Sequence, residues 1–111
     1  MPFMPGLTII VATSDPARFE AALELAAANA ALDRRTRLFL QRDAVPLLRP
    51  EPPGSALALL SEALALGAST SVCQSGLALS GMTADQLPPG VETGGLVELL
   101  ASQGDDQLLL T

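Results

Sequence analysis

The chain has 111 residues, enough for one hydrophobic core and too few for two, so we expect a single domain over residues 1–111. Hydrophobic residues make up 49% of it and charged residues 16%, a balance that excludes intrinsic disorder. Asp and Glu total 12 against 6 arginines, which gives a formal net charge of −6. A surface of that sign repels nucleic acid and anionic membranes, so we expect neither as a partner.

Several residue types that carry chemistry are missing. Without histidine there can be no Ser-His-Asp triad, no Cys-His pair and no histidine metal ligand. Without lysine there is no Schiff-base chemistry, and without tryptophan and tyrosine most platforms for stacking bases are lost. The candidates that remain are one thiol, the carboxylates, the hydroxyls and the arginines.

The first part of the chain predicts two buried strands joined by a helix. Residues 7–12 form a short, nearly continuous apolar run with β-branched residues, which is typical of a strand buried on both faces. Ser14 or Asp15 can cap the helix that follows, which should run from Pro16 to about residue 32. Residues 36–41 form the second apolar run. The pattern is therefore strand, helix, strand.

The rest of the chain predicts shorter elements. Residues 42–54 hold four prolines and read as an irregular loop with one helical turn near 44–48. Ser55 is a suitable N-cap for a helix over 56–66, and a weak strand over 69–72 ends at Cys73. The remaining predicted elements are a helix over 74–80, a turn over 83–87, a helix over about 96–102 and a last strand over 107–110.

Strands that alternate with helices through short links predict an α/β fold with a parallel sheet and helices on both faces. Ligands of such sheets bind beyond the carboxyl ends of the strands. Those ends carry Ser14 after the first strand, Arg42 after the second, and Cys73 with Gln74 after the third. The lone thiol is therefore expected at the functional edge of the sheet.

The position of Cys73 between a strand and a helix favours its thiolate. Unpaired backbone N–H groups point toward this place, so we expect the amides of Gln74, Ser75 and Gly76 to lower the thiol pKa. Arg42 would add a positive charge if its side chain folds inward. The alternative is that Cys73 is a small buried hydrophobe, because free cysteines are among the most buried residues.

The cysteine count also bears on compartment and cofactors. A single cysteine makes no intramolecular disulfide and no thiolate metal site, so we expect no metal and no cofactor. No basic residue precedes Arg18, which is unlike a secretory signal. Residues 63–84 carry no charge, but their serines and glycines are too polar and too helix-breaking for a membrane span. A cytoplasmic protein is the expected outcome.

The segment around Cys73 resembles the DsrE/DsrF-like superfamily, and within it the YrkE-like branch often labelled peroxiredoxin family. The matching segments, within 72–97, are Val72-Cys73-Gln74-Ser75, Leu77–Met82, Asp85-Gln86-Leu87, Gly90-Val91-Glu92 and Gly94-Gly95-Leu96. The resemblance implies a three-layer α/β/α sandwich with a mostly parallel sheet of four to five strands. It also implies a homo-oligomer (dimer, trimer or hexamer), a sulfur donor or acceptor protein as partner, and a role in sulfur transfer or thiol redox chemistry. In sulfur-relay members of the TusD and DsrE type the matching cysteine carries a persulfide, which would make Cys73 the acceptor.

Other functions remain open. Thr70 and Cys73 match the second half of the peroxiredoxin motif Pro-x-x-x-Thr-x-x-Cys, but Leu66 stands at the proline position and no resolving cysteine is present. The protein could instead be a non-catalytic oligomeric scaffold with a structural cysteine. It could also bind a small ligand in a cleft formed by Ser14, Arg42 and Gln74. Whether it is an enzyme at all stays open.

Charged and glycine-rich segments outside this site have simpler interpretations. We expect the arginines at 34, 35 and 37, at the amino end of the second strand and so opposite the predicted site, to solvate a turn or to pair with a neighbouring subunit. We expect Asp105 and Asp106 to form a solvated turn before the last strand. The pair Gly94-Gly95 reads as a plain turn rather than an anion site.

Overall fold

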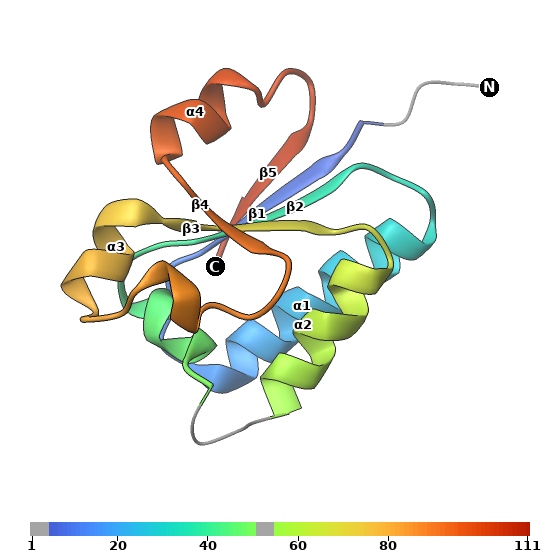
Figure 1. Cartoon of the computed structure of the whole chain (residues 1–111). Helices are drawn as coiled ribbons and strands as arrows, with labels where there is room; N and C mark the ends of the chain where they lie inside the picture. The colour runs from blue at the N-terminus through green and yellow to red at the C-terminus, as the bar shows by residue number, and fades with distance from the viewer. Residues whose placement is uncertain (1–4, 51–54) are drawn as a thin grey trace.

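The computed structural model describes residues 5–50 and 55–111, and its central feature is a five-stranded sheet (Figure 1). The strands lie in the order β4-β3-β2-β1-β5, and every neighbouring pair is parallel. The elements in chain order are β1 (Leu7–Val11), α1 (Pro16–Ala31), β2 (Thr36–Leu40), the 3-10 helix η1 (Arg42–Leu48), α2 (Ser55–Ala65), β3 (Ser69–Cys73), α3 (Gln74–Leu79), the 3-10 turn η2 (Ala84–Gln86), β4 (Val91–Gly94), α4 (Leu96–Ala101) and β5 (Gln107–Leu110).

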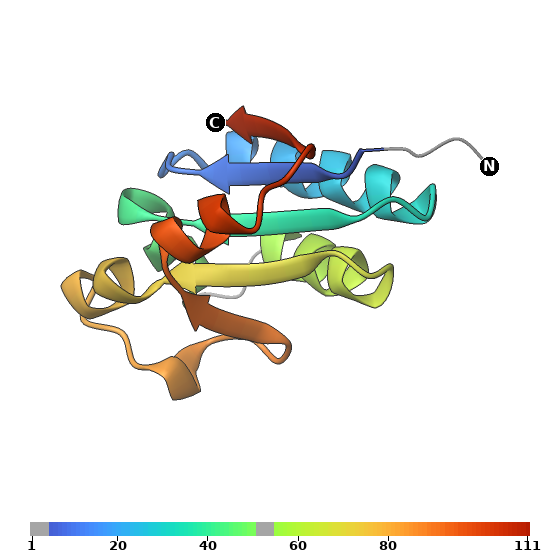
Figure 2. The same cartoon turned by 90° about the horizontal axis from the view of Figure 1, so that it is seen from above.

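Helices lie on both sides of this sheet, which confirms the predicted three-layer α/β/α sandwich. Helices α1 and α2 run side by side beneath one face, and α4 lies over the other (Figure 1). Seen from above, the strands run in parallel with α3 at the carboxyl end of β3 (Figure 2). Every predicted element is present, with its ends within about two residues of the predicted ones; the helical turn predicted near 44–48 is the 3-10 helix η1.

One strand was not predicted. β4 has only four residues, none of them buried, and it shows no apolar run of the kind that marked the other strands. It forms an edge of the sheet beside β3 and places Gly94 opposite Cys73. The extra strand therefore brings the Gly94-Gly95 segment to the thiol.

The larger core lies between the sheet and the two long helices. Asp15, not Ser14, caps α1: its Oδ1 accepts a hydrogen bond from the Ala17 N–H at 3.0 Å. The apolar side of α1 is buried, with Phe19 and Leu23 at 0% exposure. Leu60 of α2 closes this core at 1% exposure. The proposed cap Ser55 begins α2, but its side chain lies outside the described residues.

The opposite face of the sheet has a much smaller core. Its buried members are Ile10, Phe39 and Leu99, with Cys73 half-buried against them. Short α4 covers only part of this face, and several apolar side chains near it are exposed: Leu96, Val97, Leu100, Leu108 and Leu110. This face therefore has both the thiol and uncovered hydrophobic surface.

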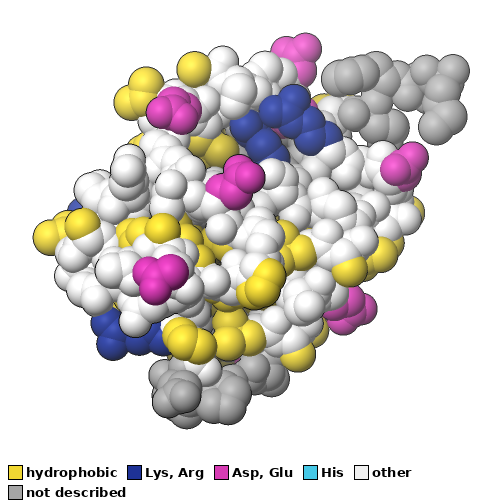
Figure 3. All heavy atoms as spheres, in the orientation of Figure 1, with side chains coloured by type: hydrophobic (Ala, Val, Ile, Leu, Met, Phe, Trp, Pro, Cys, Tyr) yellow, Lys and Arg dark blue, Asp and Glu magenta, His cyan; other side chains and the backbone are white. Residues whose placement is uncertain are grey.

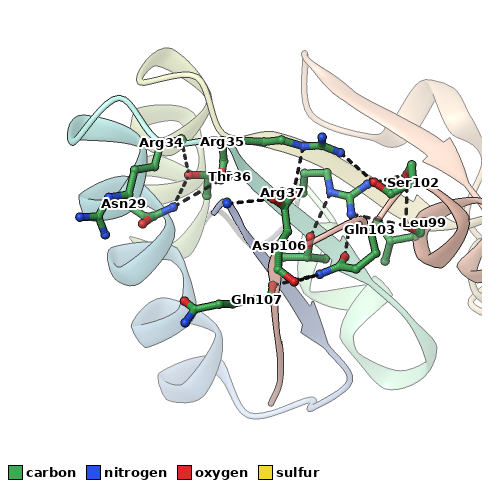
Figure 4. Close-up of polar contacts among 12 residues, drawn as sticks. Asn29, Arg34, Arg35, Thr36, Arg37, Leu99, Ser102, Gln103, Asp106 and Gln107 are labelled. Atoms are coloured by element: carbon green, nitrogen blue, oxygen red, sulfur yellow. Dashed lines mark hydrogen bonds and ion pairs between the residues drawn. The ribbon is translucent and has the colours of Figure 1, made fainter. Parts of the chain in front are cut away.

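The charged segments are more ordered than the sequence indicates (Figure 4). Asp106 is not part of a solvated turn: its side chain is 8% exposed, its Oδ1 accepts from the Gly6 N–H at 2.8 Å, and its Oδ2 pairs with Arg35 Nε at 3.2 Å. Arg37 does not simply solvate a turn either, because it donates to Thr8 and to residues at the end of α4. The residues that satisfy these groups come from distant parts of the chain, which is why local sequence did not reveal them.

Within the described part of the chain, no helix combines the length and the hydropathy that a membrane crossing requires.

Candidate functional site

Cys73 is the last residue of β3 and the N-cap residue of α3. Its backbone is still extended, with φ −64° and ψ 123°, so the side chain leaves the sheet where the helix begins. The side chain points to the face covered by α4, because alternate residues of β3 face opposite sides and Val72 lies in the larger core. The thiol is thus at the carboxyl edge of the sheet, where the sequence placed it.

The surroundings of the thiol favour its ionised form. Cys73 Sγ lies 3.2 Å from Ser75 Oγ, and this side-chain hydrogen bond is the main cause of a lowered pKa for Cys73. Burial opposes it and raises the pKa, while the backbone N–H groups of Gly76 and Ser75 lower it further. Two of the three predicted amides therefore contribute. The net direction is downward, which increases the thiolate fraction at neutral pH.

Cys73 opens into a groove of about 820 Å³, which we call the Cys73 groove. Its walls come from the end of β2, the start of α3, the end of β4 and the start of α4, and its lining residues are Gln41, Cys73, Gln74, Ser75, Ala78 and 93–98. The size lies within the range of small-molecule sites. Hydrophobic side chains around α4 stand beside acidic ones on this face (Figure 3). The thiol is therefore accessible from a mixed apolar and acidic surface.

Gly76 permits the start of α3 to lie close to η1. A Cβ added there would come within 3.1 Å of Val45 Cγ2 and 3.3 Å of the Arg42 backbone nitrogen. Arg42 itself has a left-handed backbone, with φ 53°, at the turn from β2 into η1. Gly76 thus has a packing role in addition to its N–H group near the thiol.

The structure brings together some of the predicted site residues and not others. Gln74 and Ser75 line the Cys73 groove with the thiol, and Gly76 lies buried behind them. Ser14 is exposed in the turn after β1, and Arg42 is exposed after β2; neither lines this groove. None of the six arginines lines the Cys73 groove among the residues that the structure describes. The charge that does line it is the carboxylate of Glu98.

Several groove residues were missed. Gln41 directly follows β2, so the rule that ligands bind at strand ends could have identified it. The residues at 93–98 depend on β4, a strand that the apolar pattern did not predict. The β-branched residues Val91 and Thr93, directly after a Pro-Pro-Gly break, are the signal that could have revealed this strand.

A second cavity, of about 710 Å³, lies on the other side of the molecule. It is lined mainly by apolar residues of α2 and of the segment around η2, among them Leu57, Leu64 and Leu87. The thiol does not line it. Among residues 5–50 and 55–111, no three cysteine or acidic side chains come together as a metal site. The thiol therefore lines the larger of these two cavities.

A comparison with family models shows which family this chain belongs to. The model of the DsrE/DsrF-like family matches residues 6–111. The chain belongs to the DsrE/DsrF-like family. The match extends over all elements from β1 to β5, well beyond the segment 72–97 that first suggested it. No curated protein matches the chain.

Two solved structures share the fold of this DsrE/DsrF-like chain. The YchN protein from E. coli is 25% identical with a TM-score of 0.79, and the match covers 97% of this chain and 100% of that protein. MTH1491 from Methanobacterium thermoautotrophicum, described as a protein of unknown function, is 19% identical with a TM-score of 0.81 and the same coverage. The second likeness is evidence for the fold alone.

Proposed function

We propose that this DsrE/DsrF-like protein takes part in sulfur relay by accepting sulfur on Cys73 as a persulfide and handing it on. Membership in the family indicates a role related to sulfur relay. The observation that carries the specific proposal is the placement of the chain's one thiol: it opens into the Cys73 groove, and its pKa is lowered chiefly by Ser75. A thiolate, not a thiol, is the nucleophile that such chemistry needs.

The transfer step needs no oxidant, reductant or metal. The Cys73 thiolate attacks the outer sulfur of a donor persulfide, R–S–SH, and a new S–S bond forms while the donor's S–S bond breaks. The donor leaves as the thiolate R–S⁻. The outer sulfur brings its proton with it, so Cys73 then carries the persulfide as S–SH, and this group can pass the proton to the departing thiolate or to water. The reverse step, with an acceptor thiolate as the attacking group, passes the sulfur on. Ser75 stabilises the charge on Cys73 in both directions.

We extend the proposal to the partners and location of the protein. The exposed residues Leu96, Val97, Leu100, Leu108 and Leu110 surround the thinly covered face, and apolar surface of this kind favours self-association. A homo-oligomer would cover it and would place a partner surface near the Cys73 groove. A sulfur donor or acceptor protein is the second expected partner. A reducing compartment such as the cytoplasm would keep the lone thiol free.

Sulfur loading tests the proposal directly. The protein is incubated with a cysteine desulfurase and free cysteine, and intact mass is recorded before and after reduction. The expected result is a gain of one sulfur atom that reduction removes. Cys73→Ala should abolish the gain, whereas Ala78→Ser, which changes a groove residue that bears no thiol chemistry, should retain it. A wild-type protein that gains no sulfur contradicts the proposal, and so does a gain that persists in Cys73→Ala.

The second candidate function is a non-catalytic scaffold in which Cys73 only packs. The observation in its favour is the contact of Cys73 with the core of Ile10, Phe39 and Leu99. The two functions differ in thiol reactivity. A sulfur carrier should be alkylated by iodoacetamide with a pH midpoint below that of a free thiol, whereas a structural cysteine should react slowly at every pH.

A further inference from the structure

The C-terminal end of α4 is held by polar side chains that the proposed function does not use. This cluster, which we call the Arg37 clamp, consists of Arg35, Arg37, Ser102, Gln103 and Asp106 (Figure 4). Arg37 lies on β2 and donates to Ser102 Oγ at 2.7 Å and to Gln103 Oε1 at 2.7 Å. It also donates to the Leu99 carbonyl at 3.4 Å and to Thr8 Oγ1 on β1 at 3.0 Å. One side chain therefore joins two strands to the end of α4.

The other members hold the same helix end from a second direction. Arg35 Nη2 donates to the Ser102 carbonyl at 3.2 Å, and Arg35 Nε pairs with Asp106 Oδ2 at 3.2 Å. Gln103 Nε2 donates to the Asp106 carbonyl at 2.7 Å. Asp106 in turn accepts from the Gly6 N–H. The segment that leaves α4 is thus fixed to the amino ends of β1 and β2, the ends farthest from Cys73.

Leu99 connects the clamp to the thiol. Its carbonyl accepts the hydrogen bond from Arg37, and its side chain, 8% exposed, packs in the small core with Ile10, Phe39 and Cys73. A narrower groove of about 220 Å³ starts at Arg37 and shares four lining residues with the Cys73 groove: Thr93, Gly94, Gly95 and Glu98. The same turn of α4 therefore faces Arg37 on one side and the thiol on the other.

Helix α4 depends on such contacts for its place. It has six residues, too few to be stable without tertiary contacts, and Leu99 is its one buried side chain. Its residues Leu96, Val97 and Glu98 form a wall of the Cys73 groove. If the C-terminal end of α4 were released, this wall and Leu99 would be free to move away from the thiol together.

We propose that Arg37 is a positioning residue for the Cys73 groove: by holding the last turn of α4 to the sheet, it keeps Leu99 in the small core against which Cys73 packs, and it keeps the groove wall in place. Arg37 acts on the thiol indirectly, through Leu99 of the small core and through the wall that the two grooves share, so its role is control of access rather than chemistry. The significance of this control rests on the proposed function. The control itself is measurable on the thiol without any sulfur donor.

The test compares alkylation of Cys73 by a small reagent, iodoacetamide, and by a bulky one, fluorescein maleimide. Arg37→Met removes the donors and keeps the aliphatic stem. Arg34→Met is the matched control, because it removes the same charge at the same strand end without a contact that the structure assigns to α4. We expect Arg37→Met to raise the ratio of bulky-reagent to small-reagent rate about tenfold, which corresponds to about 1.4 kcal/mol. Arg34→Met should leave the ratio unchanged, and Arg37→Lys should give an intermediate ratio.

General destabilisation is separated by a third variant and by pH. Leu23→Ala weakens the core on the other face, so any additional reaction of the thiol with the bulky reagent comes from unfolded molecules, and that additional reaction should show the pH midpoint of a free thiol. In Arg37→Met the bonds from Ser75 and from the backbone remain, so the midpoint should stay at or below that of the wild type. An unchanged ratio in Arg37→Met, or a midpoint that rises as in Leu23→Ala, overturns the positioning role. If the protein gains no sulfur but Arg37→Met still raises the ratio of alkylation rates, the proposed function is contradicted and the positioning role of Arg37 is not.

Discussion

The two faces of the sheet differ in how they are covered. On one face, α1 and α2, with 16 and 11 residues, bury Ile9, Leu38 and Leu40 to 1% exposure or less. On the other face, the six residues of α4 cover a core of only Ile10, Phe39 and Leu99. The first face provides most of the hydrophobic stabilisation, while the second leaves space for a groove beside the thiol. A parallel sheet can be stable through one well-covered face and keep the other available for function.

A matched pair of leucines measures this difference in the free energy of unfolding. Leu23→Ala in the large core should lower it by about 3–5 kcal/mol, because a completely buried leucine leaves a cavity that rigid neighbours cannot fill. Leu99→Ala should cost only about 2 kcal/mol, because the small core lies next to solvent and can relax. Chemical denaturation measures both values. Equal losses would show that the two faces contribute alike.

Substitutions of Asp105 and Asp106, just before β5, test whether polar contacts rather than a large core hold the α4 face. Asp106→Ala removes the partner of Arg35 and leaves the Gly6 N–H without its acceptor, so it should cost about 2 kcal/mol. Its exposed neighbour provides the control, and Asp105→Ala should stay within about 0.5 kcal/mol of the wild type. Thermal and chemical unfolding of both variants give the comparison. If both losses are small, the ion pair contributes little to holding α4.

The close contact between the start of α3 and η1 predicts a smaller loss of stability. Gly76→Ala would push Val45 and the Arg42 backbone away from α3, and we expect a loss of about 1 kcal/mol, the lower end of the cost of overfilling a core. Gly94→Ala is the control on the opposite side of the thiol, because an added Cβ there meets only Ser71 at an ordinary 3.8 Å. Stability measurements on both variants would show a difference between them. A neutral Gly76→Ala would mean that η1 adjusts freely.

The smallest expected effect on stability comes from a change beside the thiol itself. Ser75→Ala removes the main cause of the lowered pKa of Cys73, so the pH midpoint of iodoacetamide alkylation should move upward and the rate at pH 7 should fall. A lowered folded-state pKa stabilises the fold above the unfolded pKa of the thiol, and this contribution is lost as pH falls through the folded pKa. Ser75→Ala should reduce that pH dependence. An unmoved midpoint would assign the shift to the backbone amides.

The position of the thiol could be predicted because it depends on local pattern. Apolar runs, the Pro16 helix start and the alternation of strands with helices determine a parallel sheet, and the order of elements then places Cys73 and Gln74 at its carboxyl edge. Ser75 and Gly76 follow as the next residues along the chain. These features are local in sequence, and they required no knowledge of which distant residues would meet.

Tertiary structure decided what surrounds the thiol. The four-residue strand β4 has no apolar run, so its place beside β3, and with it the groove wall at 93–98, follows only from pairing in the sheet. Arg42, which the order of elements places at the same sheet edge, does not line the groove. The pairing of Arg35 with Asp106, and of Arg37 with the end of α4, joins residues more than 60 positions apart. Sequence pattern determines which elements form, whereas the burial and charge that govern a site come from contacts between them.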